Sequence, residues 1–92
     1  NDLAASMGLP LGLDNPHPDH ISAVSEIREA CERHGVPPGI HTASAAAVNQ
    51  RIREGFRWIA VSSDVGLMTA QAKSTLAQLE WSGSAGGVVV HE

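Results

Sequence analysis

The chain has 92 residues and a formal net charge of −4, which allows one small domain of only marginal stability by itself. The six basic residues are dispersed, so the chain lacks the basic surface of a general nucleic-acid-binding protein. No apolar run is long enough to span a membrane, and the single cysteine, Cys31, excludes an internal disulfide and fits a reducing cytoplasm.

The chain begins with the run Asn-Asp-Leu-Ala-Ala-Ser-Met-Gly, as if cut from a longer protein. Two interpretations of Asp2 are open. Its side chain is either the N-cap of a helix or an oxygen ligand for a hard divalent cation, projecting from a strand-to-helix loop.

Residues 9–14 contain Gly and Pro and indicate a loop. Pro18 suits the first position of a helix, which makes His17 the expected cap. Apolar residues then recur at helical spacing, and Gly35 ends the element. The stripe consists of Ile21, Val24, Ile27 and Cys31. His17 and His20 lie three apart, but no Cys or His pair completes a zinc site.

A strand is expected at residues 39–43, after two prolines that cannot donate to a ladder. Ser44 begins the next helix, and Gly55 ends it. Residues 56–61 form a second β-prone run, followed by a polar turn. The last helix ends near Trp81, and its expected apolar positions are Leu67, Met68, Ala72, Leu76 and Leu79. We expect residues 82–92 to be a flexible tail.

Strands that alternate with amphipathic helices predict an α/β fold built from parallel βα units. Two strands alone make a poor parallel sheet, because both faces of such strands normally need cover. The simplest account is that residues 1–81 are the C-terminal part of a (β/α)8 TIM barrel. This part would run from the end of strand six through helix eight, with two parallel strands and three helices.

The first nine residues, Asn-Asp-Leu-Ala-Ala-Ser-Met-Gly-Leu, resemble a loop of the HpcH/HpaI aldolase/citrate lyase family, the metal-dependent class II pyruvate aldolases. The similarity extends to about residue 80 in the order expected for the family. It continues through His17-Pro18, the run Gly-Val-Pro-Pro-Gly-Ile from Gly35, the run Gly-Phe-Arg-Trp-Ile-Ala-Val from Gly55, and Ser63-Asp64. The Gly-Pro pair that precedes this loop in the family is not present.

The resemblance implies that Asp2 is a direct ligand for Mg²⁺, Mn²⁺ or Co²⁺. It also implies that main-chain amides of Asn1 and Asp2 bind the carboxylate of pyruvate. The second metal ligand, an arginine and the general base of the family have no counterpart in these residues. We therefore assign no catalytic residue within this chain.

In a barrel, site residues follow the C-terminal ends of the strands. This rule selects His41, which is either an interior histidine held by its neighbours or a pocket residue that recognises the aldehyde. Family members often carry an apolar residue there, so a histidine indicates a polar or anionic aldehyde. Ser63 is a further pocket candidate, although Ser63 and Asp64 also suit a helix cap.

The parent protein is therefore expected to be an enzyme that forms or cleaves 4-hydroxy-2-oxo acids, with pyruvate and an aldehyde as partners. Alternatives are an acyl-CoA lyase similar to the citrate lyase β-subunit or malyl-CoA lyase, and a non-catalytic truncated barrel. We expect the 92 residues alone to be inactive. The parent is expected to be a cytoplasmic homo-oligomer, with Leu76 and Leu79 facing another subunit.

Overall fold

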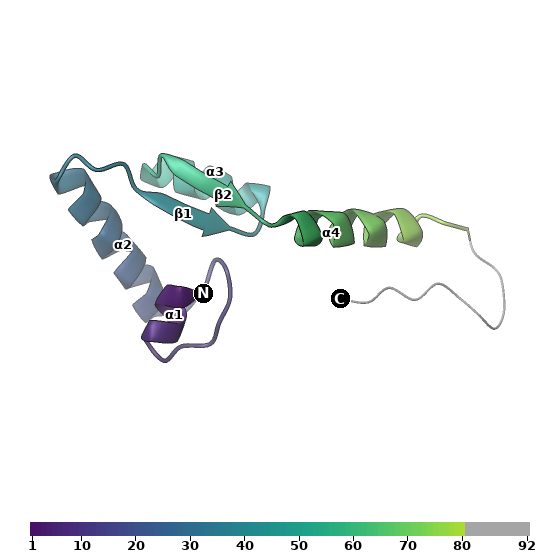
Figure 1. The fold of residues 1–92 in the computed structure, drawn as a ribbon, viewed down its shortest axis with the longest axis horizontal. Coiled ribbons are helices and arrows are strands. Elements are labelled where there is room, and N and C mark those ends of the chain that lie inside the picture. The colour runs from purple at the N-terminus through teal and green to yellow at the C-terminus, as the bar shows by residue number, and fades with distance from the viewer. Residues whose placement is uncertain (81–92) are drawn as a thin grey trace. The chain divides into compact units, whose positions relative to one another are not determined.

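A computed structural model describes residues 1–80 of the chain. These residues form four helices and a two-stranded parallel sheet (Figure 1), which confirms the α/β class. The order is α1 (Asp2–Ser6), α2 (Pro18–Arg33), β1 (Gly39–Thr42), α3 (Ala45–Glu54), β2 (Trp58–Val61) and α4 (Asp64–Ala77). The predicted boundary at residue 81 and the predicted tail at residues 82–92 lie outside the described residues.

Helix α1 is a fourth helix beyond the three that the sequence predicts, and it lies where the sequence indicates a loop. Small helix-compatible residues allow one short turn of helix here. Gly8 then adopts a φ of 69°, which a glycine tolerates without steric cost. Its N–H and that of Leu9 donate to the carbonyls of Ala5 and Ala4, which closes the helix with a Schellman motif.

Helix α2 begins and ends where the sequence predicts. His17 is the N-cap, and its Nδ1 accepts a hydrogen bond from the Asp19 N–H at 3.1 Å. The predicted apolar stripe is only partly right. Val24 is buried and Cys31 is half-buried, but Ile21 and Ile27 are exposed, and His20 is buried instead. The buried face is therefore rotated towards His20, because the neighbouring segments cover only that side of the helix.

The strands β1 and β2 pair in parallel, with Gly39 opposite Trp58 and His41 opposite Ala60. Side chains alternate between the faces of a sheet, so these four residues share one face. All four are exposed, and Trp58 retains 76% of its surface. On the other face Thr42 is fully buried, and Ile40 and Ile59 are half-buried. Val61, which is also on this face, is exposed. This face is therefore covered in part and the first face is open, while α3 packs against β2.

Contacts divide the chain into two compact units, residues 1–62 and the part from Ser63 onward. Among the described residues, the buried apolar side chains are Ala4, Val24 and Phe56, all in the first unit. In the second unit, the Ser63 hydroxyl accepts a hydrogen bond from the Gly66 N–H at 3.0 Å, which confirms the cap of α4. The helix ends at Ala77, before the predicted end near Trp81, because the N–H groups of Gln78 and Leu79 bond three residues back. None of the helices in residues 1–80 has the length and apolar character needed to cross a bilayer.

A prediction follows for Gly39, because a Cβ at this position would lie 2.9 Å from the Trp58 carbonyl oxygen and 3.0 Å from Cε3 of its ring. We expect Gly39→Ala to push β2 away and to lower the free energy of unfolding by about 1–3 kcal/mol. Urea unfolding measures this change. Gly12→Ala is the matched control, because a Cβ at Gly12 meets no atom within 4 Å. Equal stability of the two variants would contradict the predicted clash.

Candidate functional site

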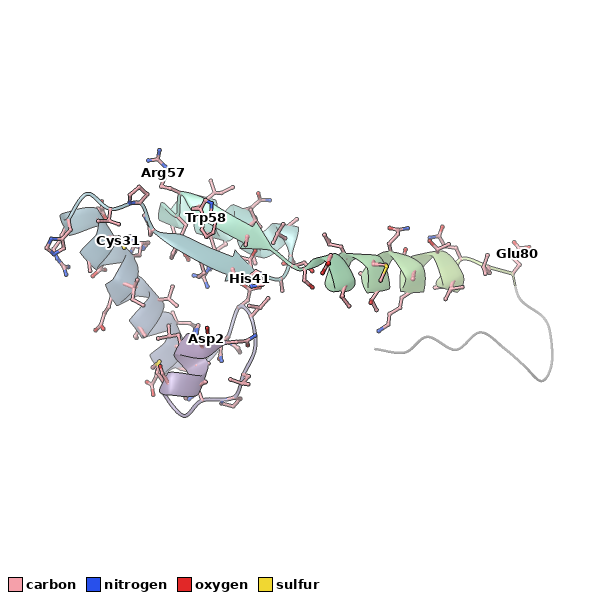
Figure 2. All side chains as sticks on the ribbon, in the orientation of Figure 1. Asp2, Cys31, His41, Arg57, Trp58 and Glu80 are labelled. Carbon is pink, nitrogen blue, oxygen red and sulfur yellow. The ribbon has the colours of Figure 1, made fainter. Side chains whose placement is uncertain are left out.

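A pocket of about 410 Å³ in the first unit brings together three of the residues selected from the sequence, Asn1, Asp2 and His41. Asn1 and Asp2 come from the start of α1, and His41 comes from β1 (Figure 2). The remaining walls come from the loop before α2, from α2 itself and from α3. They consist of Leu3, Gly12, Leu13, Asp14, His20, Val24, Ile40 and Arg51.

Asp2 is the first residue of α1, and Asn1 occupies the cap position. The interpretation of Asp2 as the helix cap is therefore wrong. The Asp2 side chain is exposed, and no hydrogen bond or ion pair within residues 1–80 engages its carboxylate. These oxygens are therefore not committed to local structure, as the proposed ligand role requires.

His41 is exposed on the open face of the sheet and is also held by a neighbour. Its Nε2 lies 2.6 Å from the carbonyl oxygen of Ser62. Because a carbonyl only accepts, the imidazole nitrogen donates in this bond. Ser62 has a φ of 55°, and its own N–H donates to the Thr42 carbonyl at 2.8 Å. The turn after β2 thus orients the His41 imidazole. His41 is held by a neighbour but is not an interior residue in this structure, and its recognition of an aldehyde stays a prediction.

Two wall residues, Asp14 and His20, were not selected from the sequence. Asp14 Oδ2 accepts a hydrogen bond from the Ala43 N–H at 2.9 Å, which ties the loop before α2 to the end of β1. Its Oδ1 and the Nδ1 of His20 are buried without a partner in the described part of the chain. The Asp-Asn-Pro run is a turn signal that can be read from the sequence. The burial of His20 cannot, because the apolar spacing in α2 predicts a different buried face.

Arg51 forms the α3 wall of the pocket and is fixed on two sides. Its guanidinium donates to Glu54 Oε2 at 2.9 Å and lies 5.7 Å from the centre of the Phe56 ring. Partial burial raises the pKa of Glu54, but hydrogen bonds from Arg51 and Gln50 and the charges of Arg51 and Arg28 outweigh this effect. The net result is a Glu54 pKa below its ordinary value.

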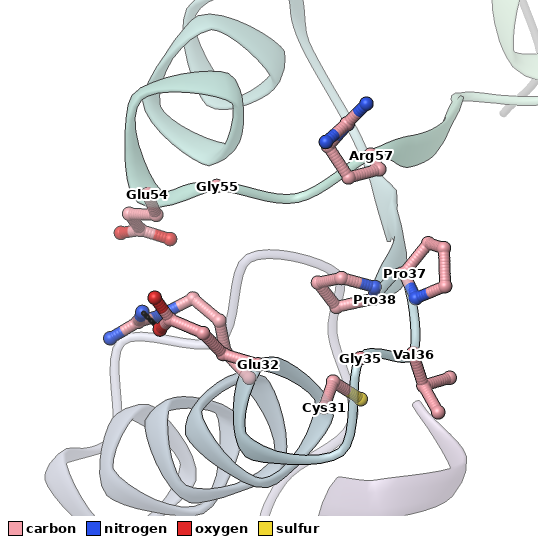
Figure 3. A pocket seen from close by; sticks show the side chains of 10 residues that line it. Cys31, Glu32, Gly35, Val36, Pro37, Pro38, Glu54, Gly55 and Arg57 are labelled. Carbon is pink, nitrogen blue, oxygen red and sulfur yellow. Dashed lines mark ion pairs between the residues drawn. The ribbon is translucent and has the colours of Figure 1, made fainter.

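A second pocket, of about 390 Å³, lies where the chain enters the two strands (Figure 3). Its walls include Cys31, the segment from Gly35 to Pro38, and Arg57. Arg28 also lines it and pairs with Glu32 at 3.8 Å. None of the residues selected from the sequence for chemistry lines this pocket, so it is not the candidate site.

The donors for a metal ion are incomplete in the described residues. Within residues 1–80, no group of three or more His, Cys, Asp and Glu side chains is arranged to hold an ion. A hard divalent cation takes about six oxygen ligands, which include waters and substrate oxygens. Asp2 therefore fits the role of one ligand, and the others must come from elsewhere in the whole protein, from substrate or from water.

Ser63 begins the second unit and is not among the residues that line this pocket. Its hydroxyl serves as the cap of α4. The pocket role of Ser63 remains a prediction.

No family model matches the chain. Over most of its length, however, the sequence is similar to that of curated aldolases. It is 36% identical over 78 residues to a protein from Paraburkholderia phytofirmans named hydroxypyruvate/pyruvate aldolase, a match that covers 85% of this chain and 29% of the relative. A protein of the same name from Rhizorhabdus wittichii is 26% identical over 76 residues, which cover 83% of this chain and 30% of the relative. The chain thus spans less than a third of the length of the curated relatives it matches.

The lowered pKa of Glu54 predicts a pH dependence of stability. A carboxylate with a lowered folded-state pKa stabilises the fold above its unfolded pKa of about 4.3, and this contribution is lost as the pH falls through the lowered value. We expect Glu54→Gln to remove about 0.3–0.5 kcal/mol at neutral pH and to flatten the acid side of the stability profile. Denaturant unfolding between pH 7 and pH 3 measures both effects. Glu26→Gln changes the same charge at an exposed position of α2, and a profile identical to that of Glu54→Gln would contradict this assignment.

Proposed function

We propose that this chain is the C-terminal part of a metal-dependent pyruvate aldolase of the HpcH/HpaI class. The observation that carries the proposal is the convergence of Asn1, Asp2 and His41 on one pocket. Asn1 and Asp2 are the positions to which the resemblance gives substrate-binding and metal-binding roles, and His41 is the residue selected from the end of a predicted barrel strand. Similarity to two proteins named hydroxypyruvate/pyruvate aldolase, over more than four fifths of the chain, supports the aldolase part of this proposal.

The open sheet face supports a barrel as the fold of the whole protein. The strands are parallel, and the face of Gly39, His41, Trp58 and Ala60 is exposed. Parallel strands are normally covered on both faces. In a (β/α)8 barrel the inward face is covered by the other strands of the barrel, and the helices cover the outward face. In such a barrel, His41 would lie on the inward side, near the end of its strand, where barrel enzymes carry their sites.

The roles that we propose for Asn1 and Asp2 are those that the resemblance to the aldolase family implies. The amides of Asn1 and Asp2 bind the carboxylate of the 2-oxo acid, and the Asp2 carboxylate is one ligand of a Mg²⁺, Mn²⁺ or Co²⁺ ion. When bound, such an ion acts as a Lewis acid on the keto oxygen. His41, oriented by Ser62, contacts the aldehyde. Because Asp2 is the one metal ligand that we assign within residues 1–80, we expect the 92 residues alone to show no turnover.

Asp2 provides the direct test in the whole protein. We expect Asp2→Asn to lower kcat/KM for retro-aldol cleavage of a 4-hydroxy-2-oxo acid by about 100-fold or more, because a neutral amide binds a hard cation weakly. A chelator is expected to abolish the activity of the parent, and Mn²⁺ or Co²⁺ to restore it. Asp19→Asn, an exposed position on α2, is the matched control. Activity that survives chelation would refute the proposal and favour a lysine Schiff base.

His41 tests the assignment of the aldehyde contact. We expect His41→Leu to change the ratio of kcat/KM between polar and apolar aldehydes by about tenfold, because it replaces a polar contact with an apolar one. The KM for pyruvate should change by less than about twofold, since uniform binding of pyruvate is untouched. Steady-state kinetics with paired aldehydes measures both, and His34→Leu is the control at an exposed histidine. An unchanged ratio would remove His41 from the aldehyde site.

A further inference from the structure

The His41 imidazole has two ring nitrogens, and the Ser62 carbonyl occupies one of them. Nε2 lies 2.6 Å from this oxygen, so Nε2 must carry a proton. If Nδ1 alone carried the proton, two lone pairs would face each other at that distance. The second nitrogen of a neutral imidazole is an acceptor, and Nδ1 has no hydrogen bond within residues 1–80. The ring therefore offers a ligand the lone pair of Nδ1.

Ser62 holds its carbonyl against the ring through an uncommon backbone conformation. Its φ is 55°, in the left-handed region that residues with a Cβ seldom adopt. Its N–H donates to the Thr42 carbonyl at 2.8 Å, which extends the parallel pairing by one residue beyond Val61, the end of β2. Both bonds of Ser62 thus use main-chain atoms. Such local strain is often kept where a group must hold a defined position.

The main chain that follows His41 is also fixed. Thr42 is fully buried, and its hydroxyl donates to the Ala60 carbonyl at 3.0 Å. The Ala43 N–H donates to Asp14 Oδ2 at 2.9 Å. Because these bonds hold the end of β1 in place, a displaced Ser62 carbonyl would release the imidazole without carrying the strand along with it. The direction of the ring therefore depends on the conformation of Ser62.

We propose that Ser62 is a positioning residue, whose left-handed main chain fixes the His41 ring so that Nδ1 is the atom that contacts the aldehyde. This inference rests on the proposed function, which includes the contact between His41 and an aldehyde. It divides the roles of the two ring nitrogens, because Nε2 anchors the side chain and Nδ1 recognises the ligand. The backbone conformation at position 62, and not the Ser62 hydroxyl, then controls the aldehyde preference.

Substitutions at position 62 test this role in the whole protein, with glycolaldehyde and acetaldehyde as a polar and an apolar acceptor for pyruvate. Ser62→Gly removes the hydroxyl but tolerates a φ of 55°. We expect it to keep the ratio of kcat/KM for the two aldehydes within about twofold. Ser62→Val introduces a β-branched residue that disfavours this φ, and should change the ratio by about tenfold. The KM for pyruvate should change by less than about twofold in both.

Ser22→Val, at an exposed position of α2, is the matched control and should leave the ratio unchanged. An unchanged ratio in Ser62→Val overturns the positioning role. A change in Ser62→Gly as large as that in Ser62→Val overturns it as well, because the hydroxyl would then be the group that matters.

A double-mutant cycle separates positioning from general damage to the fold. In a His41→Leu background, Ser62→Val should not change the aldehyde ratio further, because it acts through the imidazole. Additive effects of the two substitutions overturn the inference.

The two ring nitrogens are separated by His41→Gln, which keeps a donor near the position of Nε2 but has no polar atom at that of Nδ1. It should change the aldehyde ratio as much as His41→Leu does. Retention of the original ratio would exclude Nδ1 as the recognising atom. This variant leaves Ser62 untouched, so it decides the matter even where Ser62→Val fails to fold.

An NMR measurement that requires no turnover separates this inference from the proposed function. The Nε2–H of His41, assigned by its loss in His41→Leu, should give a signal that is protected from exchange with water. The signal should persist in Ser62→Gly and disappear in Ser62→Val. This result supports the positioning of the ring even if the protein turns over no aldehyde, an outcome that refutes the aldolase proposal alone. Loss of the signal in Ser62→Gly, or its persistence in a folded Ser62→Val, overturns the positioning role whether or not the protein is an aldolase.

Discussion

The parallel pairing of β1 with β2 is the constraint on which the first unit depends. It fixes the register that places His41 beside Ala60 and lets the Ser62 carbonyl receive the imidazole N–H. The pairing also separates a covered face, where Thr42 is fully buried, from an open face that exposes Trp58. Parallel strands are normally covered on both faces, so the exposure of this face is an unusual feature of the described residues.

The candidate site depends on the caps of helices α1 and α2 and on one hydrogen bond between residues that are distant in sequence. Asp2 is the first residue of α1, and His17 caps α2, whose first turn carries the buried His20. The bond between Asp14 and the Ala43 amide joins these elements to the end of β1 across 29 residues of sequence. The pocket therefore depends on backbone geometry at strand and helix ends more than on a large apolar core.

The small core is consistent with this dependence. Ala4, Val24 and Phe56 are the buried apolar side chains of the described residues, and many larger ones are exposed. Full burial of a side chain such as Phe56 contributes about 1.5–3 kcal/mol, which is modest against the conformational entropy of the chain. Large apolar side chains such as Trp58, Leu67 and Met68 are exposed in the described residues and do not contribute to this core.

The sequence alone determined the helices and strands whose ends carry strong local signals. Residues that start or end a helix act on backbone groups only a few positions away, so their effects can be predicted without knowledge of the fold. They are Pro18, Ser44, Gly55 and Ser63. The resemblance of the first residues to an aldolase loop indicates Asp2 as a metal ligand without any knowledge of its surroundings.

Only the tertiary structure decided which residues share the pocket. The burial of His20, the exposure of Ile21 and the bond from Ala43 to Asp14 depend on segments that are distant in sequence. The short helix α1 was also missed, because its closure depends on backbone bonds to Ala4 and Ala5 that a five-residue pattern does not reveal. Local propensity acts along the chain, whereas burial is set by which distant surfaces meet, and that information lies in the packing of the folded chain.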